Sequence, residues 1–314
     1  MTQLDIVDLD LNLLKVFEAL YEEGGAGRAA IRLELTQSAV SSALRRLRGV
    51  YGDSLFTRTG RGLAPTARAD ELKPVIAEAL DRCRQSLAMT AGDTGDYRGR
   101  SVSLGMSDDF EMAVGHRVMD AVAKRAPGLR VIFRQTHSHI VADALLNRQI
   151  DLAIASGGFT SRGLSRQTLG EGNYACLVDP ESLLDQQGKL TLDEYVARPH
   201  ILVSSGGVVG IVDEALANVG RRRQICASTT HFAALPYFLH GSDAIATIPA
   251  HAAAAISRLT ALRLLPCPLA LPHYPIELGW RTVRMRDSAV AAVHHAIVES
   301  FDNADWRGEI PLRG

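Results

Sequence analysis

The feature that most restricts the fold is a change of pattern close to residue 100. Up to residue 89, apolar residues recur mainly at helical spacing. Beyond that point, runs that favour strands alternate with runs that favour helices. A polar, glycine-containing segment at 91–100 separates the two patterns and is predicted to be a linker. Because 314 residues suffice for two or three domains, the change is interpreted as a domain boundary.

The part before the linker is predicted to be mainly helical. Its predicted elements are helices at 8–21, 28–33 and 36–48, a hairpin at 55–66, and a long helix from 66 to about 89. Thr36 is a suitable N-cap for the third helix. The long helix carries an apolar stripe that suits pairing with a second copy. Pro74 predicts that this helix is kinked or begins late.

The part after the linker is predicted to be α/β. Strands are expected at 101–106, 129–135 and 151–155, with helices at 109–125 and 140–148 between them. Such alternation indicates a parallel sheet with right-handed crossovers. Less regular alternation continues to residue 248, and a late strand at 278–284 and a final helix at 288–303 complete the pattern.

Positive charge is concentrated in a short stretch of the first part. Residues 28–68 contain eight arginines and two acidic residues, a net charge of +6, whereas the whole chain has a net charge of −1. A local basic patch on a nearly neutral protein is typical of a module that binds a polyanion. The alternative is a solvated charged face without a ligand.

Two short helices joined by a tight turn, with basic flanks, describe a helix-turn-helix. Base contacts are predicted from the exposed side of the second helix, at Thr36, Gln37, Ser38, Ser41, Ser42 and Arg45. Phosphate contacts are predicted from Arg45, Arg46 and Arg48 at its far end and from Arg58 and Arg61 in the hairpin. The alternative is an ordinary three-helix core with a polar surface.

Three runs of residues carry a resemblance to a known family. They are LTQSAVSSALRRLR at 35–48, GDSLFTR at 52–58 and GLAPT at 62–66. Together they closely resemble the LysR-type transcriptional regulators. The opening DLDLNLL at 8–14 resembles the branch that includes NodD and NahR-like regulators. The resemblance is weaker further on, at HFAA (231–234) and ATIP (246–249).

The resemblance implies a multidomain α+β protein. It would have a winged helix-turn-helix at 1–66, a linker and dimerisation helix with a hinge at 67–97, and an effector-binding domain at 98–314. The last would be a two-lobed, periplasmic-binding-protein-like α/β domain with a ligand cleft between its lobes. Lobe one is expected at about 98–178 and 281–314, and lobe two at about 179–280.

The effector is expected where strand ends and helix N-termini meet at the open edge of a parallel sheet. By position within the resemblance, the candidates in lobe one are Ser107, Asp108, Thr136, His137, Ser156 and Gly157. In lobe two they are Ser204, Ser205, His231, Phe232 and Pro249. For each, the alternative is a loop hydroxyl, a cap or a packed ring. An aromatic or other organic acid is the expected effector, although Asp108 would repel a plain anion.

Two positions depart from the family pattern. Gly25-Ala26-Gly27 stands where a polar cap usually precedes the second helix, and glycine is a poorer cap. Glu34 occupies a turn position that is often glycine. A left-handed conformation there would cost about 1 kcal/mol. Neither departure removes a residue predicted to face DNA.

Other function classes find little support. Hydrolase, metalloprotease, phosphate-loop and dinucleotide-binding motifs do not occur, which argues against an enzyme. A solute-binding protein would share the second part but not the basic first part. His137 and His139 lack an obvious third metal ligand, and the four cysteines lack a CxxC spacing, so neither a metal, a cofactor nor a disulfide framework is predicted.

The predicted partners follow from this interpretation. They are double-stranded DNA, a small-molecule effector and a second copy of the chain, with RNA polymerase and assembly to a tetramer implied by the resemblance. No apolar run is long enough to span a membrane and the first ten residues do not resemble a secretory signal, so a cytoplasmic protein is predicted.

Overall fold

The structure is a computed structural model that describes residues 9–60, 62–88, 97–182, 190–204, 206–207 and 209–302. The chain divides into two compact units, residues 1–94 and 95–314, and each has its own apolar core. Among the described residues, no helix combines the length and the apolar character that crossing a membrane requires.

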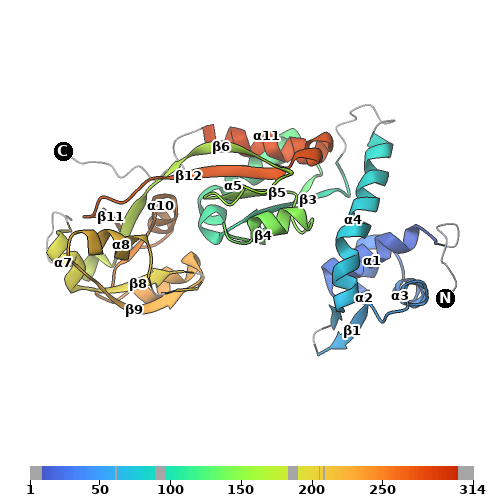
Figure 1. The fold of residues 1–314 in the computed structure, drawn as a ribbon, viewed down its shortest axis with the longest axis horizontal. Helices are drawn as coiled ribbons and strands as arrows, with labels where there is room; N and C mark the ends of the chain where they lie inside the picture. Colours follow the sequence, from blue (N-terminus) through green and yellow to red (C-terminus); the bar gives the residue numbers. More distant parts are fainter. Residues whose placement is uncertain are drawn as a thin grey trace. The chain divides into compact units, whose positions relative to one another are not determined.

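The first unit is a helical core with a two-stranded wing (Figure 1). Its elements are α1 (Asn12–Glu23), α2 (Ala26–Leu33), α3 (Gln37–Tyr51), β1 (Phe56–Thr59), β2 (Gly62–Pro65) and α4 (Ala67–Ala88). Phe17, Leu20, Val40 and Leu47 are fully buried in its core. Side chains of α4 join the same core, so this helix packs against the helix-turn-helix. Pro74 lies inside α4, which begins at Ala67 and therefore does not start late.

The wing is fixed to the end of α1 by a close backbone approach. The Leu63 amide donates to the Gly24 carbonyl at 2.8 Å. Gly62 has a φ of +143°, and a Cβ atom there would lie 2.4 Å from the same carbonyl oxygen. Only glycine meets both requirements, which explains the residue that opens β2.

The second unit begins with a mixed sheet that we call lobe one (Figure 1). Its strands are β3 (Ser101–Met106), β4 (Arg130–Gln135), β5 (Leu152–Ala155), β6 (Leu164–Gly172) and β12 (Tyr274–Arg281), in the order β4-β3-β5-β12-β6. Its helices are α5 (Asp108–Arg125), α6 (Val141–Leu146), η4 (Thr282–Arg286) and α11 (Ser288–Asp302). Leu152 and Ile154 face α5 and α11, whereas Ala153 and Ala155 face α6, so helices cover both faces.

The three strands expected to form a parallel sheet do so in lobe one, and two further strands make the sheet mixed. β3 runs parallel to β4 and β5, but β12 is antiparallel to β5 and β6. The reason is that β12 brings the chain back from elsewhere in the unit instead of following a crossover helix. β6 is the long edge strand that pairs with β12, and it was not predicted because its sequence shows no apolar alternation.

We call the rest of the second unit lobe two. Its elements are β7 (Tyr174–Val178), η2 (Pro180–Ser182), α7 (Leu192–Ala197), β8 (Pro199–Val203), α8 (Ile211–Asn218), β9 (Gln224–Thr229), η3 (Phe232–Ala234), α9 (Leu235–Leu239), β10 (Ala246–Pro249), α10 (Ala250–Leu259) and β11 (Arg263–Pro266). β7 is the centre of the antiparallel order β10-β7-β11, while β8 pairs in parallel with β9. A parallel bridge between His200 and Ile245 connects the two groups of strands.

The chain changes lobes earlier than the boundaries at residues 178 and 281. β7 pairs with β10 and β11, so its residues belong to lobe two instead of lobe one. β12 pairs with β5 and β6 from Tyr274 onward, so its residues belong to lobe one. Both shifts have the same cause. The lobe to which a strand belongs is determined by its pairing partners, which are distant in sequence and cannot be recognised from local patterning.

Candidate DNA-binding and effector sites

Helix α3 presents a polar face on an apolar support. The Thr36 hydroxyl accepts a hydrogen bond from the Ala39 amide at 3.2 Å and so caps the helix as predicted. Val40, Leu44 and Leu47 are buried on the inner side. The residues predicted to contact bases are all exposed, namely Thr36, Gln37, Ser38, Ser41, Ser42 and Arg45. Their helical spacing places them on the side away from the core.

The predicted phosphate-binding arginines do not share one environment. Arg48 donates to the Ser54 carbonyl at 2.8 Å and to the Phe56 carbonyl at 2.9 Å, so it holds the start of the wing. Arg46 forms an ion pair with Asp10 at 3.1 Å, with 57% of its side chain exposed. Arg58 is exposed on β1, and Arg61 lies outside the described residues. Arg58 is thus a better candidate for a phosphate contact than Arg48, whose guanidinium is already hydrogen-bonded to the wing.

The turn before α3 contains a residue other than glycine in the left-handed conformation, which is unfavourable for a residue with a side chain. Glu34 has φ 54° and ψ 38°, in the left-handed region, where it ends α2. Gly25 occupies the N-cap of α2 without a side-chain hydrogen bond. Both departures from the family pattern therefore fall on the ends of the same short helix.

Glu34→Gly is expected to stabilise this turn by about 1 kcal/mol, because glycine adopts a positive φ without the Cβ clash. Hydrogen exchange of peptides from α2 and α3 in the full-length protein measures the effect. Amides that exchange through opening of this turn should slow about fivefold. Lys15→Gly, an exposed change in the middle of α1, is the control and should not slow these amides.

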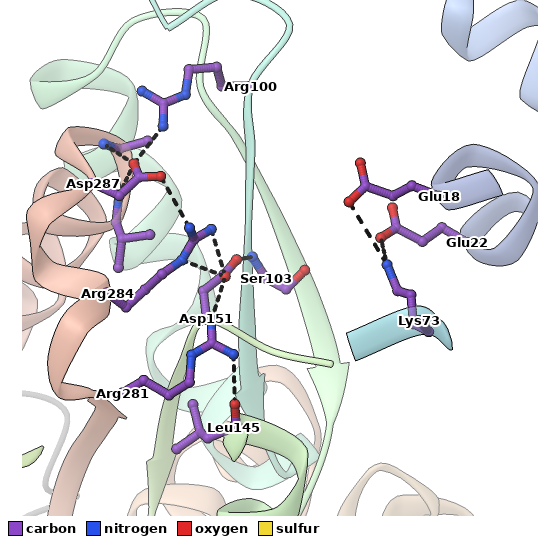
Figure 2. A network of polar contacts seen from close by, with 12 residues as sticks. Glu18, Glu22, Lys73, Arg100, Ser103, Leu145, Asp151, Arg281, Arg284 and Asp287 are labelled. Atoms are coloured by element: carbon purple, nitrogen blue, oxygen red, sulfur yellow. Dashed lines mark hydrogen bonds and ion pairs between the residues drawn. The ribbon is translucent and has the colours of Figure 1, made fainter. Parts of the chain in front are cut away.

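A buried charge cluster connects three helices of the first unit, and sequence reasoning missed it. The Lys73 ammonium on α4 lies 2.8 Å from Glu22 and 4.0 Å from Glu18, both on α1 (Figure 2). Arg32 of α2 pairs with Glu22 at 2.6 Å. Burial alone would raise the pKa of Glu22, but Lys73 and Arg32 hold it below its usual value. Glu22 therefore stays charged and ties α2 and α4 to α1.

In the second unit, the lobe-one candidates meet at one edge of the sheet. β3 lies between β4 and β5 and runs parallel to both, so Ser107, Thr136 and Ser156 follow neighbouring strand ends. The Thr136 amide donates to the Met106 carbonyl at 3.0 Å, which joins the first two ends directly. Ser156 is exposed, and Gly157 beside it has a φ of +84°.

Three of these candidates carry buried polar atoms with no hydrogen-bond partner among the described residues. They are Oδ1 of Asp108, Oγ1 of Thr136 and Nδ1 of His137. Thr136 is only 2% exposed. A buried polar group without a partner costs about 1–3 kcal/mol, so a bound polar molecule would offset an existing penalty here.

Lobe two reaches this edge through η3. Oδ2 of Asp108 accepts a hydrogen bond from the Ala233 amide at 3.0 Å, which brings the segment after β9 to the start of α5. His231 in this segment is exposed, whereas Phe232 packs partly against the core of lobe two. The predicted pair is therefore split between an accessible ring and a packed one.

The other lobe-two candidates have local roles. Pro249 ends β10 at the N-cap position of α10. The Ser204 hydroxyl accepts from the amides of Gly206 and Gly207 at 3.3 and 3.1 Å, so it stabilises a glycine turn. Ser205 lies outside the described residues. None of these contacts brings Ser204 to Asp108 or Thr136.

A second contact between the lobes was missed entirely. His251 of α10 lies 3.0 Å from Asp109 of α5, and their side chains are 2% and 6% exposed. The His251 ring also stacks on Phe110 at a centroid distance of 4.5 Å. Burial would raise the pKa of Asp109, but His251 and the Ser107 hydroxyl keep it below its usual value. In the sequence, the one feature that could have pointed to this contact is a single histidine among five alanines at 250–255.

A larger ionic network stabilises lobe one at the opposite end of β3 (Figure 2). Asp151 accepts hydrogen bonds from the Ser103 amide at 2.9 Å and from Arg284 at 3.0 Å. Asp287 pairs with Arg100 at 2.5 Å and with Arg284 at 3.3 Å. The network joins the first residues of lobe one to η4 and the start of α11, so its role is structural.

Comparison with known proteins finds a matching family model for each of the two units. Residues 11–70 match the family model described as bacterial regulatory helix-turn-helix protein, lysR family, and residues 95–302 match the LysR substrate binding domain. The HTH-type transcriptional activator NahR of Pseudomonas putida is 32% identical over 287 residues, which cover 91% of this chain and 95% of NahR.

Two further relatives extend over almost the same length. Nodulation protein D 3 of Rhizobium leguminosarum bv. phaseoli is 30% identical, covering 90% of this chain and 93% of that protein. The crystal structure of the probable transcriptional regulator PA0477 from Pseudomonas aeruginosa superposes with a TM-score of 0.73 at 28% identity. That match covers 92% of this chain and 98% of PA0477.

Proposed function

The chain belongs to the LysR family of bacterial transcription regulators, and we propose that it reads a specific duplex DNA site through α3 under the control of an organic effector. Because its relatives are transcription regulators, it is a regulator and not an enzyme. The two-part fold inferred from the resemblance is confirmed, with a helix-turn-helix followed by a substrate-binding domain.

The exposed polar face of α3 carries the DNA-binding proposal. Gln37 and Ser38 stand in the first turn, the part of a recognition helix that usually reaches base edges. Gln37 suits adenine and Arg45 suits guanine. Arg58 on the wing, and Arg45 and Arg46 beyond the middle of α3, would contact phosphates. Arg48 contributes by holding the wing at the angle that these contacts require.

The unpartnered groups of Asp108, Thr136 and His137 support an effector site at the edge of the lobe-one sheet. The proposed effector is a small organic molecule, in the class of aromatic or other organic acids. Asp108 would then receive a hydrogen bond from a donor on the ligand, since its carboxylate repels the ligand's own. Because Asp108 also accepts from Ala233, the same side chain would link ligand binding to the contact between the lobes.

The remaining partners are part of the same proposal. Two copies would pair through α4, on which Val75 is 65% exposed, and place two α3 helices about one turn of DNA apart. Further assembly to a tetramer, contact with RNA polymerase and a cytoplasmic location are proposed because a regulator of this family acts on the chromosome beside the polymerase.

Gln37→Ala tests whether α3 reads bases. Binding to the preferred site should weaken by about 1–3 kcal/mol if a bidentate base contact is lost, while affinity for unrelated duplexes stays unchanged. Fluorescence anisotropy with matched and scrambled duplexes measures both. Lys15→Ala, an exposed change on α1, should alter neither. An equal loss on both duplexes would contradict the recognition role of α3.

Arg58→Ala tests the phosphate contact of the wing. Every duplex should bind more weakly, and the slope of log affinity against log salt should decrease by about 1. Arg222→Ala, an exposed arginine of the second unit, serves as the charge-matched control and should keep the wild-type slope. A selective loss for one sequence would instead indicate a base contact by Arg58.

A further inference from the structure

Two cysteines that lie 91 positions apart in sequence lie together in lobe two. Cys176 stands at the centre of β7 and is fully buried. β11 pairs with β7 so that Leu265 is opposite Cys176. Cys267, two residues further along, therefore lies on the same face of the sheet as Cys176. Both side chains belong to the same apolar cluster, with Cys176 inside it and Cys267 packed against it.

The surroundings give the two thiols different chemical characters. Cys176 also contacts the Thr247 hydroxyl at 3.5 Å, and this hydroxyl lies 2.6 Å from the Tyr195 hydroxyl. Burial raises the pKa of the Cys176 thiol well above its usual value. The hydrogen bond from Cys176, with help from the Leu269 amide and Arg223, lowers the pKa of Cys267. Cys267 is also partly exposed, so it combines thiolate character with access.

The other two cysteines lack this arrangement. Cys226 is exposed, and its thiol donates a hydrogen bond to the His200 carbonyl at 3.3 Å. Cys83 is exposed on α4 of the first unit. All four are free thiols in the structure. The chain thus supplies two accessible single thiols against which a paired thiol can be compared.

We propose that Cys176 and Cys267 form a reversible redox site in lobe two, which a peroxide converts to an intramolecular disulfide. The Cys267 thiolate attacks one peroxide oxygen, the O–O bond breaks, and the second oxygen leaves as water after taking a proton. The Cys176 sulfur then attacks the Cys267 sulfenic acid, and the S–O bond breaks with loss of a second water. Two thiols are oxidised to one disulfide while one peroxide is reduced to two waters.

The bridge would act on the connection between the lobes. Cys267 begins the segment that leads from β11 back to β12, and Leu269 and Leu271 of this segment pack against the same cluster. A disulfide to β7 fixes the start of this segment and takes Cys176 away from Thr247. Oxidation therefore alters lobe two without requiring the effector.

Mass spectrometry of the full-length protein tests the site. Trypsin releases Cys176 in peptide 167–189 and Cys267 in peptide 264–281, each with a single cysteine. After hydrogen peroxide treatment and alkylation, these two peptides should appear linked, with loss of two hydrogens, and dithiothreitol should separate them. Before oxidation, iodoacetamide should label Cys267 faster than the more exposed Cys226.

Two variants separate the steps. Cys176→Ser should leave a sulfenic acid on Cys267 that dimedone traps, whereas Cys267→Ser should leave Cys176 reduced. Cys226→Ser should form the wild-type bridge. The proposal is overturned if Cys83 or Cys226 is oxidised while peptides 167–189 and 264–281 remain unlinked. It is equally overturned if Cys267 labels more slowly than Cys226 in the untreated protein.

Discussion

Lys73→Met is expected to destabilise the first unit by about 3 kcal/mol. The substitution keeps most of the apolar stem but removes the ammonium that lies between Glu18 and Glu22. Loss of one partner from a buried ion pair typically costs 3–5 kcal/mol because a charge remains without compensation. The lower end applies here, since Arg32 still pairs with Glu22.

Hydrogen exchange with peptide resolution measures this effect, because both tryptophans, Trp280 and Trp306, belong to the second unit and their fluorescence does not report on the first. Amides of α1 and α4 that exchange only by global opening of the first unit should lose a factor of about 150 in protection. Lys15→Met, at an exposed position of α1, is the matched control and should change protection little. Equal protection in both variants would show that the cluster contributes no stability.

Asp109→Ala is expected to destabilise the second unit by a similar amount, about 3 kcal/mol. The change removes the carboxylate that pairs with His251 across the lobes and accepts a hydrogen bond from Ser107. It leaves a buried histidine and a small void at the contact between α5 and α10. Tryptophan fluorescence in urea measures the loss, and Asp120→Ala on the same helix, which removes an exposed Asp–His pair, should cost little.

The stabilisation by Asp109 should also depend on pH in one direction. Its folded-state pKa lies below the value of an unfolded aspartate, so the carboxylate binds fewer protons in the folded protein. Its contribution is therefore complete above about pH 4 and is lost as the pH falls through the folded-state pKa. Wild-type stability should fall more steeply than that of Asp109→Ala in this acidic range. Parallel acid limbs would contradict the assignment.

Local patterning was sufficient for most of the first unit. Thr36 caps α3 as expected, Val40, Leu44 and Leu47 form its inner side, and Glu34 adopts the left-handed conformation anticipated at the turn. These features depend on residues close in sequence, where helix periodicity and capping chemistry are informative. The ion pairs of Lys73 with Glu22 and Glu18 could not be predicted in this way, because they join residues 51 and 55 positions apart.

The second unit was harder to predict, and the reason is long-range strand pairing. β6 reads as LSRQTLGEG, without apolar alternation, and exists because its backbone pairs with β12 more than 100 residues later. The antiparallel pairing of β12 makes the sheet of lobe one mixed and moves the second crossing point, while the pairing of β7 with β10 and β11 moves the first. Strand propensity depends on such neighbours more than on the strand's own residues.

The sequence predicted the positions of the candidate site residues better than it predicted their roles. The sequence brought Asp108, Thr136 and His137 to one sheet edge, where each has an unpartnered polar atom. It did not reveal that Arg48 donates hydrogen bonds to the start of the wing, or that Asp109 and His251 pair across the lobes. Such side-chain interactions depend on tertiary contacts, which sequence motifs do not show.

Selection of genomic DNA fragments by the purified full-length protein, at two salt concentrations, tests the central claim most directly. Enrichment of a partly two-fold symmetric duplex site, with affinity that falls steeply as salt rises, is the predicted result. The absence of enrichment at both salt concentrations would contradict the assignment of α3 as a helix that reads DNA sequence.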